Sequence, residues 1–348
     1  MKTHYSVGWD IGGAHVKAAV SNVSGSIIGV YQQPCPLWLG LTHLRQAVQE
    51  ILQTLPAGSY QHAITMTGEL VDLFAGRDDG VQQIIQTLEQ LLPQQSLTVF
   101  AGKRGLVPIA AVCAADYADI ASSNWLASAS YAAQKIGDGV FIDVGSTTTD
   151  ILCLQQGKVQ TNAYTDHQRL ISQELLYTGI VRTAVMAVAQ TAVDQGQTIN
   201  IMAEYFATMA DVYRLTGELN EANDQTTTAD GGEKTTNASA RRLARMIGCD
   251  FYLEELPRWQ LFAENIRSQQ LRRIQTAYEQ VCLKTDCIKQ PLIGAGVGRF
   301  LVKALADQIA SPYIDFTDLC PATLMASSMD IADCAPAAAL AMMKIGQE

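Results

Sequence analysis

FIDVGSTTTD, residues Phe141–Asp150, is the stretch that decides the fold of this chain. Its apolar start predicts a buried strand, and the glycine with its three threonines predicts a tight turn into a second strand. The segment VGWDIGGAHVKAAV, residues Val7–Val20, has the same order of strand, aspartate, glycine turn and strand. A Walker P-loop would need a Lys-Ser/Thr pair opening a helix, which neither copy has. The two copies therefore predict two related halves whose β-hairpin turns face one ligand.

The residue types in both turns suit a phosphate group. Glycine lets the backbone approach an anion closely, and N–H groups and hydroxyls donate hydrogen bonds to it. Asp10 and Asp143 repel phosphate and are instead predicted to hold a hydrated Mg²⁺ that bridges to it, while Lys17 is predicted to neutralise it as a point charge. The predicted phosphate-binding residues are Gly12, Gly13, Ala14, Gly145, Ser146, Thr147 and Thr148. For one copy alone, an ordinary Asp-Gly hairpin is the alternative.

Length and composition predict a globular chain. It has 348 residues, of which 48% are hydrophobic and 17% charged, enough for two cores and too apolar for disorder. The net charge of −10 argues against nucleic acid or an anionic membrane as the main partner. The eight cysteines form no CxxC pair, which argues against a structural zinc site. With neither a signal-like segment nor an apolar run of membrane-spanning length, we expect a cytoplasmic protein with reduced thiols. A homodimer stays open.

The periodicity of apolar residues predicts an α/β chain with a first domain of residues 1–135 plus 335–348 and a second of residues 136–334. Strands are expected at 5–10, 16–21, 27–31, 62–67, 97–101, 106–108, 140–143, 148–154, 158–161 and 313–316. Helices are expected from 42, at 81–92, 172–191 and 199–215, from 239, and at 256–282, 299–310 and 335–345. The polar residues 218–238 have no apolar period and predict a long loop of the lid or disordered kind.

Three further carboxylates are candidates for acid–base or metal chemistry. Glu69 follows the strand at 62–67, and ligands bind at the carboxyl ends of strands in open α/β sheets; a carboxylate capping the next helix is the alternative. Glu204 and Asp211 are seven residues apart, which places both on one face of the helix predicted at 199–215. In a cleft they would form a metal or general-base pair, and on a surface they would have no role.

Other polar residues are candidates for binding the substrate. Asn124, before Trp125, is either a ligand contact or a helix N-cap beside a core tryptophan. Arg182 is either an anion clamp or part of a solvated helix face. The segment PLIGAGVG (291–298) predicts a strand and a glycine turn before a helix, where an adenosine or other flat group would bind at Gly294, Gly296 and Gly298. A basic group, which would close over an anion or face solvent, consists of Arg241, Arg242 and Arg245.

Two strand–turn–strand phosphate motifs in a duplicated α/β chain resemble those of the actin, sugar-kinase and heat-shock chaperone superfamily. Within it, DIGG at residues 10–13 and DVGSTTTD at 143–150 are similar to the two phosphate motifs of the hydantoinase A/oxoprolinase family. Large members end the first motif in Thr-Asp, where this chain has His15-Val16-Lys17, and this chain is much shorter, which argues against their ring-opening amide hydrolysis. The resemblance implies two ribonuclease-H-like (actin-like ATPase) domains with a central cleft.

A short branch of that family, found in methanogens and in methylotrophs that use tetrahydromethanopterin, is similar over nearly the whole chain. The shared segments are MTGEL (66–70), SNW (123–125), YTG (177–179) followed by RT (182–183), AEYFA (203–207) and ADVY (210–213). The resemblance implies a transferase of methanofuran or methylofuran assembly. It would join an aminomethylfuran-methyl diphosphate to the phenol oxygen of a tyramine or tyrosine unit and release diphosphate.

The proposed reaction needs a base near a phenol whose free pKa is about 10. Glu69, Glu204 and Asp211 are the candidates, and the sequence does not rank them. Two other function classes stay open. An ATP-dependent kinase or ATPase, with ATP or another nucleotide as cofactor, is favoured by the superfamily resemblance and by residues 294–298. A nucleotide-binding regulator without turnover would instead hold nucleotide tightly and bind a stable protein partner.

Overall fold

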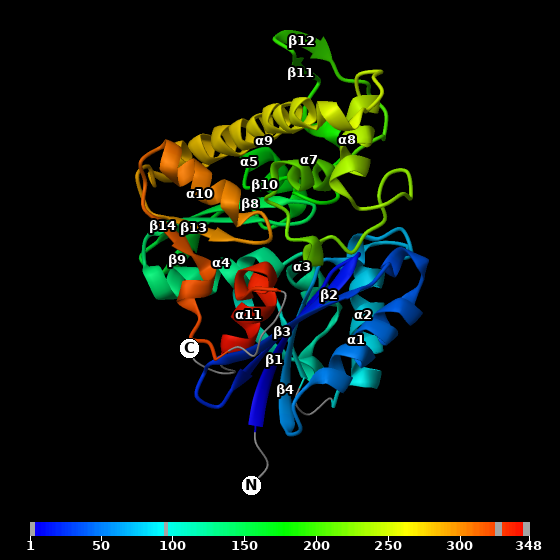
Figure 1. The fold of residues 1–348 in the computed structure, drawn as a ribbon. Helices are drawn as coiled ribbons and strands as arrows, with labels where there is room; N and C mark the ends of the chain where they lie inside the picture. The colour runs from blue at the N-terminus through cyan, green and yellow to red at the C-terminus, as the bar shows by residue number, and fades with distance from the viewer. Residues whose placement is uncertain (1–3, 94–96, 324–328, 344–348) are drawn as a thin grey trace. The chain divides into compact units, whose positions relative to one another are not determined.

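The structure is a computed structural model that describes residues 4–93, 97–323 and 329–343 (Figure 1). Contacts between Cα atoms divide the chain into two compact units, each with its own sheet and core. The first unit comprises Met1–Gly139, Leu154–Gln168 and Ile314–Glu348, and the second comprises Val140–Cys153 and Arg169–Tyr313. No helix in the described ranges is both long and apolar enough to cross a membrane.

The first unit is built on a six-stranded sheet of order β3-β2-β1-β4-β5-β6. Strand β1 is antiparallel to β2 and parallel to β4, so the carboxyl ends of β1 and β4 meet at one edge. Helix α11 packs on β1 and β2. The strands are β1 (His4–Ile11), β2 (His15–Asn22), β3 (Ile27–Pro34), β4 (Ser59–Met66), β5 (Leu97–Phe100) and β6 (Leu106–Pro108). The helices are α1 (Leu41–Thr54), α2 (Arg77–Leu91), α3 (Tyr117–Ile120), α4 (Asn124–Ile136) and α11 (Ala335–Met342).

The second unit is built on a sheet of order β10-β8-β7-β13-β14, in which β7 is parallel to β13 and β9 also pairs with β8. A separate hairpin is formed by β11 and β12. The strands of this sheet and of the hairpin are β7 (Gly139–Val144), β8 (Thr149–Gln155), β9 (Lys158–Gln160), β10 (Leu175–Leu176), β11 (Thr191–Asp194), β12 (Gln197–Asn200), β13 (Leu292–Ala295) and β14 (Tyr313–Asp315), of which β9 falls in the first unit. The boundary between the units divides α5 (Asp166–Ser172) after Gln168. The helices of the second unit that follow are α6 (Val185–Val188), α7 (Met209–Thr216), α8 (Thr236–Arg245), α9 (Leu256–Thr285) and α10 (Arg299–Gln308).

The two sheets repeat one topology. In the first sheet, the hairpin of β1 and β2 is antiparallel, and β4 and β5 follow on the other side of β1 as parallel strands. In the second sheet, the strand order β8-β7-β13-β14 corresponds to the order β2-β1-β4-β5 of the first. This order is typical of ribonuclease-H-like, actin-like ATPase domains, so the predicted α/β fold class is confirmed. The strands predicted at 5–10, 16–21 and 62–67 are also present, each extended by one or a few residues.

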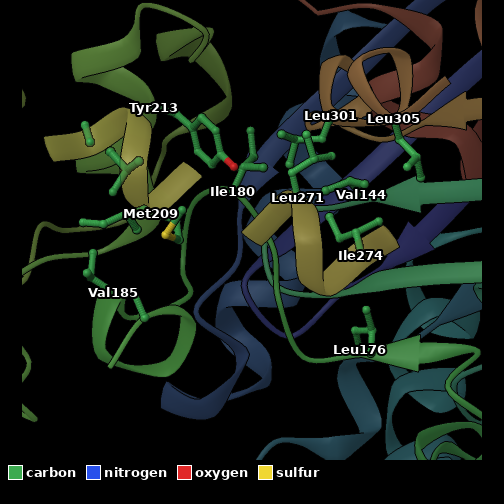
Figure 2. Packing of buried hydrophobic residues seen from close by; sticks show 14 of the residues in the cluster. Val144, Leu176, Ile180, Val185, Met209, Tyr213, Leu271, Ile274, Leu301 and Leu305 are labelled. Atoms are coloured by element: carbon green, nitrogen blue, oxygen red, sulfur yellow. The ribbon is translucent and has the colours of Figure 1, made fainter. Parts of the chain in front are cut away.

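The core of the second unit is organised by helix α9. Its buried side chains recur at helical spacing, among them Phe262, Ile266 and Ile274. Figure 2 shows Leu271 and Ile274 of α9 beside Val144 of β7, within one cluster of buried apolar side chains. Burying each such side chain contributes about 2 kcal/mol, so α9 and the sheet form a rigid support for the turn that follows Val144.

The helix predicted at 172–191 is wrong. Helix α5 ends at Ser172, β10 pairs with β8 through Leu175 and Asp150, and only the four residues of α6 are helical further on. The apolar residues in this stretch, such as Ile180 and Val185, are buried in the core without helical periodicity. Pairing with β8 and backbone hydrogen bonds to the turn after β7 override the local helix propensity here.

The helix predicted at 199–215 is wrong in its first half. Residues 197–200 form β12, and α7 begins only at Met209, because Thr208 and Asp211 form a capping box. Helix α8, by contrast, begins earlier than expected, because Thr235 rather than Ser239 accepts the capping hydrogen bond.

Ion pairs tie the polar residues 218–238 to the helices on either side of them. Arg214 of α7 pairs with Glu221 and Asp224, and Arg242 of α8 pairs with Asp230. Arg242 is fully buried, so the expectation of a basic group on a solvated face is wrong for this residue.

Candidate active site

The first predicted phosphate turn joins β1 to β2. The N–H of Gly12 donates to the carbonyl of His15 at 2.9 Å and closes the turn. Asp10 lies opposite Lys17 in the register of β1 and β2 and is almost fully buried. The Nζ of Lys17 donates to the carbonyl oxygen of Asp333 at 2.6 Å. An ammonium has three donors, so Lys17 is held in place and keeps donors for a further acceptor.

The carbonyl groups of this turn are tied to the segment after β3. The N–H of Leu37 donates to the carbonyl of Gly13 at 3.0 Å, and the N–H of Cys35 donates to the carbonyl of Ala14 at 2.8 Å. Hydrogen bonds to its carbonyl groups therefore hold the turn in place. Such a turn can present N–H groups to an anion without reorganising, although the role of Gly12, Gly13 and Ala14 as phosphate ligands stays a prediction.

The second predicted phosphate turn joins β7 to β8 and closes in the same way. The N–H of Gly145 donates to the carbonyl of Thr148 at 2.8 Å. The carbonyl of Ser146 accepts hydrogen bonds from the N–H groups of Val181 and Arg182, at 3.1 and 2.9 Å. The Oγ of Ser146 is buried and has no hydrogen-bond partner among the described residues. An unpartnered buried hydroxyl is costly unless a ligand satisfies it, which fits a phosphate oxygen.

Two glycines permit close approach to this second turn. A Cβ at Gly179 would lie 2.4 Å from the backbone nitrogen of Thr147. Gly296 has φ +79°, and a Cβ there would lie 2.2 Å from Oδ1 of Asp143 and 2.4 Å from the carbonyl of Val144. Only glycine fits either place, so the residues after β10 and after β13 both converge on the turn of the second unit.

The three glycines of residues 294–298 have different environments. Gly294 lies inside β13, where a Cβ would meet the ring of Tyr313 at 2.6 Å. Gly296 forms the turn, and the N–H of Gly298 donates to the carbonyl of Val144 at 2.8 Å before α10 begins. Their binding of a nucleotide stays a prediction.

Glu69 lies at the sheet edge where the first turn begins. Ile11 and Met66 are neighbours in the parallel register of β1 and β4, and the N–H of Thr67 donates to the carbonyl of Ile11 at 2.9 Å. The segment after β4 is therefore bound to the end of β1, next to Asp10 in the chain. The predicted place of Glu69 at a carboxyl edge is confirmed.

The carboxylate of Glu69 is held in a buried polar cluster. Its side chain has no exposed surface, and its Oε1 accepts a hydrogen bond from Oγ of Ser122 at 2.6 Å. The Nη2 of Arg77 lies 3.7 Å from the same oxygen and donates to Ser122 Oγ at 2.8 Å. Arg77 also pairs with Asp166 at 2.5 Å. The other carboxylate oxygen, Oε2, is buried and accepts no hydrogen bond from the described residues.

The surroundings of Glu69 determine its charge state. Burial raises the pKa of its carboxyl above the usual value. The Ser122 hydrogen bond, the backbone N–H of Glu69 itself and the Arg77 charge lower it, and Asp166 raises it. Sequence analysis missed Ser122, Arg77 and Asp166. No spacing links three residues on three separate segments, and the left-handed backbone of Ser122, with φ 49°, carries no sequence signal of its own.

The remaining candidates lie in ordinary structural settings. Trp125 is a core residue, as one of the two alternatives for this pair proposed, but the N-cap of α4 is Ser123 and Asn124 is the first helical residue, so Asn124 as the N-cap is wrong. Glu204 is exposed and lies outside any helix, so it does not share a helix face with Asp211 and that prediction is wrong. Arg182 is exposed, and its backbone N–H is one of the two that donate to the carbonyl of Ser146 in the second turn.

The residues present fit magnesium but do not form a closed metal cage. Within residues 4–93, 97–323 and 329–343, no group of three or more His, Cys, Asp or Glu side chains is arranged to hold a metal. Asp10 and Asp143 are each the residue before the last of the central strand of their own sheet. Mg²⁺ usually takes one or two carboxylates and fills its other positions with water and substrate phosphate. Their role as metal ligands stays a prediction.

Comparison with known proteins identifies the family. The model of the hydantoinase/oxoprolinase family matches residues 61–337, well over half of the chain. The chain belongs to this family. One relative, from Methanocaldococcus jannaschii, is 26% identical over 303 residues, which cover 87% of this chain and 88% of the relative. It is named (4-{4-[2-(gamma-L-glutamylamino)ethyl]phenoxymethyl}furan-2-yl)methanamine synthase.

Other comparisons agree with the family and the fold. A protein of the same name from Methanococcus vannielii is 32% identical over 111 residues, which cover 32% of this chain and 50% of that protein. Among solved structures, nucleotide-free acetone carboxylase has a TM-score of 0.56 at 10% identity and covers 86% of this chain and 66% of its own. This similarity shows that this family member shares the fold of that enzyme.

Proposed function

We propose that this family member is a transferase of methanofuran-type carrier assembly. The observation that carries the proposal is the match over 87% of the chain to a relative named as a synthase of a phenoxymethylfuran methanamine. A phenoxymethyl group on a furan is an ether between a phenol oxygen and a methylene carbon. The proposed reaction forms that ether from an aminomethylfuran-methyl diphosphate and a tyramine or tyrosine unit.

The balance of the reaction defines what the site must do. The phenol oxygen forms a bond to the methylene carbon, and the bond from that carbon to diphosphate breaks with its electron pair on diphosphate. The phenol proton passes to a base. Positioned N–H groups and cations at the departing diphosphate supply the largest share of such catalysis. The two fixed turns and Lys17 are groups of that kind.

Magnesium would neutralise the departing diphosphate if Asp10 or Asp143 binds it. Each carboxylate is the residue before the last of a central strand, one residue ahead of the turn predicted to bind phosphate. In Asp10→Ala and in Asp143→Ala we expect magnesium-dependent turnover to be lost while the circular dichroism spectrum stays unchanged. Wild-type rates in either variant would exclude that carboxylate as a metal ligand.

The proposal is tested with purified protein, Mg²⁺, the furan diphosphate and tyramine, tyrosine or glutamyl-tyramine as acceptor. Diphosphate and ether are followed together, and ATP is supplied in a parallel reaction. We expect ether and diphosphate to form in equal amounts without ATP. Release of phosphate from ATP while the furan diphosphate stays intact would contradict the proposal and identify an ATP-using enzyme instead.

A further inference from the structure

We infer that Glu69 is the base that takes the phenol proton and that Ser122, Arg77 and Asp166 are positioning residues that hold its carboxylate ready. This inference rests on the proposed function. Sequence analysis leaves three carboxylates as equal candidates for the base, and the structure distinguishes them by their hydrogen-bond partners.

Asp211 is already occupied as a structural group. Its Oδ2 accepts the N–H of Thr208 at 3.1 Å, and its Oδ1 accepts from Ser239 Oγ at 2.7 Å and from Arg242 Nε at 2.8 Å. Both oxygens of Asp211 are therefore already bound by fixed donors of the fold, which is the setting of a structural carboxylate. Glu204 is exposed and outside regular structure, and among the hydrogen bonds described here its carboxylate accepts only the N–H of the neighbouring Tyr205 at 3.2 Å, so it is less firmly positioned than Glu69.

Glu69 differs because one oxygen is fixed and the other is unpartnered. Ser122 and Arg77 hold Oε1, whereas the buried Oε2 accepts no hydrogen bond within the described ranges. Leaving a buried acceptor unpaired costs about 1–3 kcal/mol, and such cost is typical of groups kept for function. The hydroxyl of a phenol is the donor that Oε2 lacks.

The environment also adjusts the strength of this base. Burial raises the pKa of Glu69, which brings it closer to that of a phenol and makes proton transfer less unfavourable. The charged groups that face Glu69 are Arg77 of α2 and Asp166 of α5, and they act in opposite directions. Because Asp166 also binds Arg77, it moderates how strongly the guanidinium stabilises the carboxylate.

Apolar side chains adjoin Glu69 in the chain. Leu70 is 44% exposed and Leu73 is 39% exposed, both in the segment that follows β4. Exposed leucines beside a buried acid suit an acceptor that combines an aromatic ring with one ionisable hydroxyl.

The first arm of the test compares Glu69→Gln with wild type in the ether-forming assay. We expect kcat to fall by about 100-fold or more, since a positioned base contributes about 10²–10⁴-fold, with KM for the furan diphosphate changed less than threefold. If wild type forms ether and E69Q stays within threefold of its kcat, the assignment is overturned and the proposed function stands. If wild type forms no ether, both are overturned.

The second arm reads the pH dependence of kcat, which a purely structural role would not shift in an ordered way. We expect the acid limb to move to higher pH in Ser122→Ala and Arg77→Met, which lose groups that lower the pKa of Glu69. It should move to lower pH in Asp166→Asn. The matched control is Arg45→Met, because Arg45 is an exposed arginine of the same unit that bonds only to Gln90 in the hydrogen bonds described here. Shifts in one common direction, or none, would overturn the positioning roles.

Discussion

Two buried carboxylates, Glu69 in the first unit and Asp211 in the second, are each 1% exposed and have opposite surroundings. Asp211 accepts hydrogen bonds from a backbone N–H, a hydroxyl and the guanidinium of Arg242, and it caps α7. In Glu69, one carboxylate oxygen accepts a hydrogen bond from the Ser122 hydroxyl, and the guanidinium of Arg77 lies 3.7 Å from the same oxygen. The number of donors around a buried acid, rather than its burial, therefore separates a structural carboxylate from a candidate base.

This difference extends to the strands beside the two central ones. In the first unit β4 lies next to β1 and is followed by Glu69, whereas in the second unit β13 lies next to β7 and is followed by Gly296. Equivalent places in a duplicated topology thus carry an acid in one unit and a glycine turn in the other.

The largest stability effect is expected from Asp211→Asn. Arg242 is fully buried, and removing the charge of its partner costs about 3 kcal/mol, in line with other broken buried ion pairs. Urea unfolding monitored by fluorescence measures the loss. Glu204→Gln is the control and should change the free energy of unfolding by less than about 0.5 kcal/mol. Equal stabilities for the two variants would contradict the structural role of Asp211.

The next effect is expected from Gly296→Ala. Alanine would adopt a left-handed backbone and place its Cβ 2.2 Å from Asp143 Oδ1, so we expect a loss of about 2 kcal/mol or more. Thermal unfolding followed by circular dichroism checks it. Gly76→Ala is matched as a glycine before a helix with no atom within 4 Å of its Cβ position, and it should be nearly neutral. A G296A variant as stable as G76A would contradict the close approach described after β13.

A smaller effect is expected from Lys17→Met. The variant loses the hydrogen bond to the Asp333 carbonyl, a loss of about 1 kcal/mol. Chemical denaturation measures it against Lys303→Met, which removes an exposed pair with Asp307 and should cost less than about 0.5 kcal/mol. If K303M is the more destabilised variant, Lys17 is not held as described.

The smallest effect, and one of opposite sign, is expected from Glu69→Gln. Because burial raises the pKa of Glu69 in the folded state, the folded protein binds this proton more tightly than the unfolded chain. The stabilisation of the folded protein by this bound proton is complete below the usual pKa of 4.5. It is lost as the pH rises through the higher pKa that Glu69 has in the folded state. Since E69Q does not titrate, its melting temperature should exceed that of wild type at pH 8, with a smaller gain at pH 5. An E69Q variant less stable than wild type at pH 8 would contradict the claim that burial disfavours the charged carboxylate of Glu69.

Much of the fold could be predicted from the sequence because local signals and the final structure agree. The strands before the turns at residues 10–14 and 143–148 are short, continuous apolar runs, which are typical of buried strands, and the structure buries them. Residues 172–208 could not be predicted, since their backbone bonds to distant groups, as Val181 does with Ser146 and Val185 with Ala207. Long-range pairing of that kind leaves no periodic signal.

The candidate site could be predicted only in part. The place of Glu69 follows from its position after a strand, and the structure confirms it. The partners of Glu69 could not be inferred, because Ser122 lies 53 residues away in sequence and Asp166 lies 89 residues from Arg77. The spacing of Glu204 and Asp211 misled because it assumed a continuous helix, which the capping box at Thr208 rules out.

The measurement that tests the account most directly is one turnover reaction with a heavy-oxygen label on the phenol of the acceptor, in the absence of ATP. Mass spectrometry of both products then shows which bonds formed and broke. The account predicts that the label is retained in the ether and that the released diphosphate is unlabelled, with one diphosphate per ether. Label in the phosphate product, or consumption of ATP as a requirement for ether formation, would contradict it.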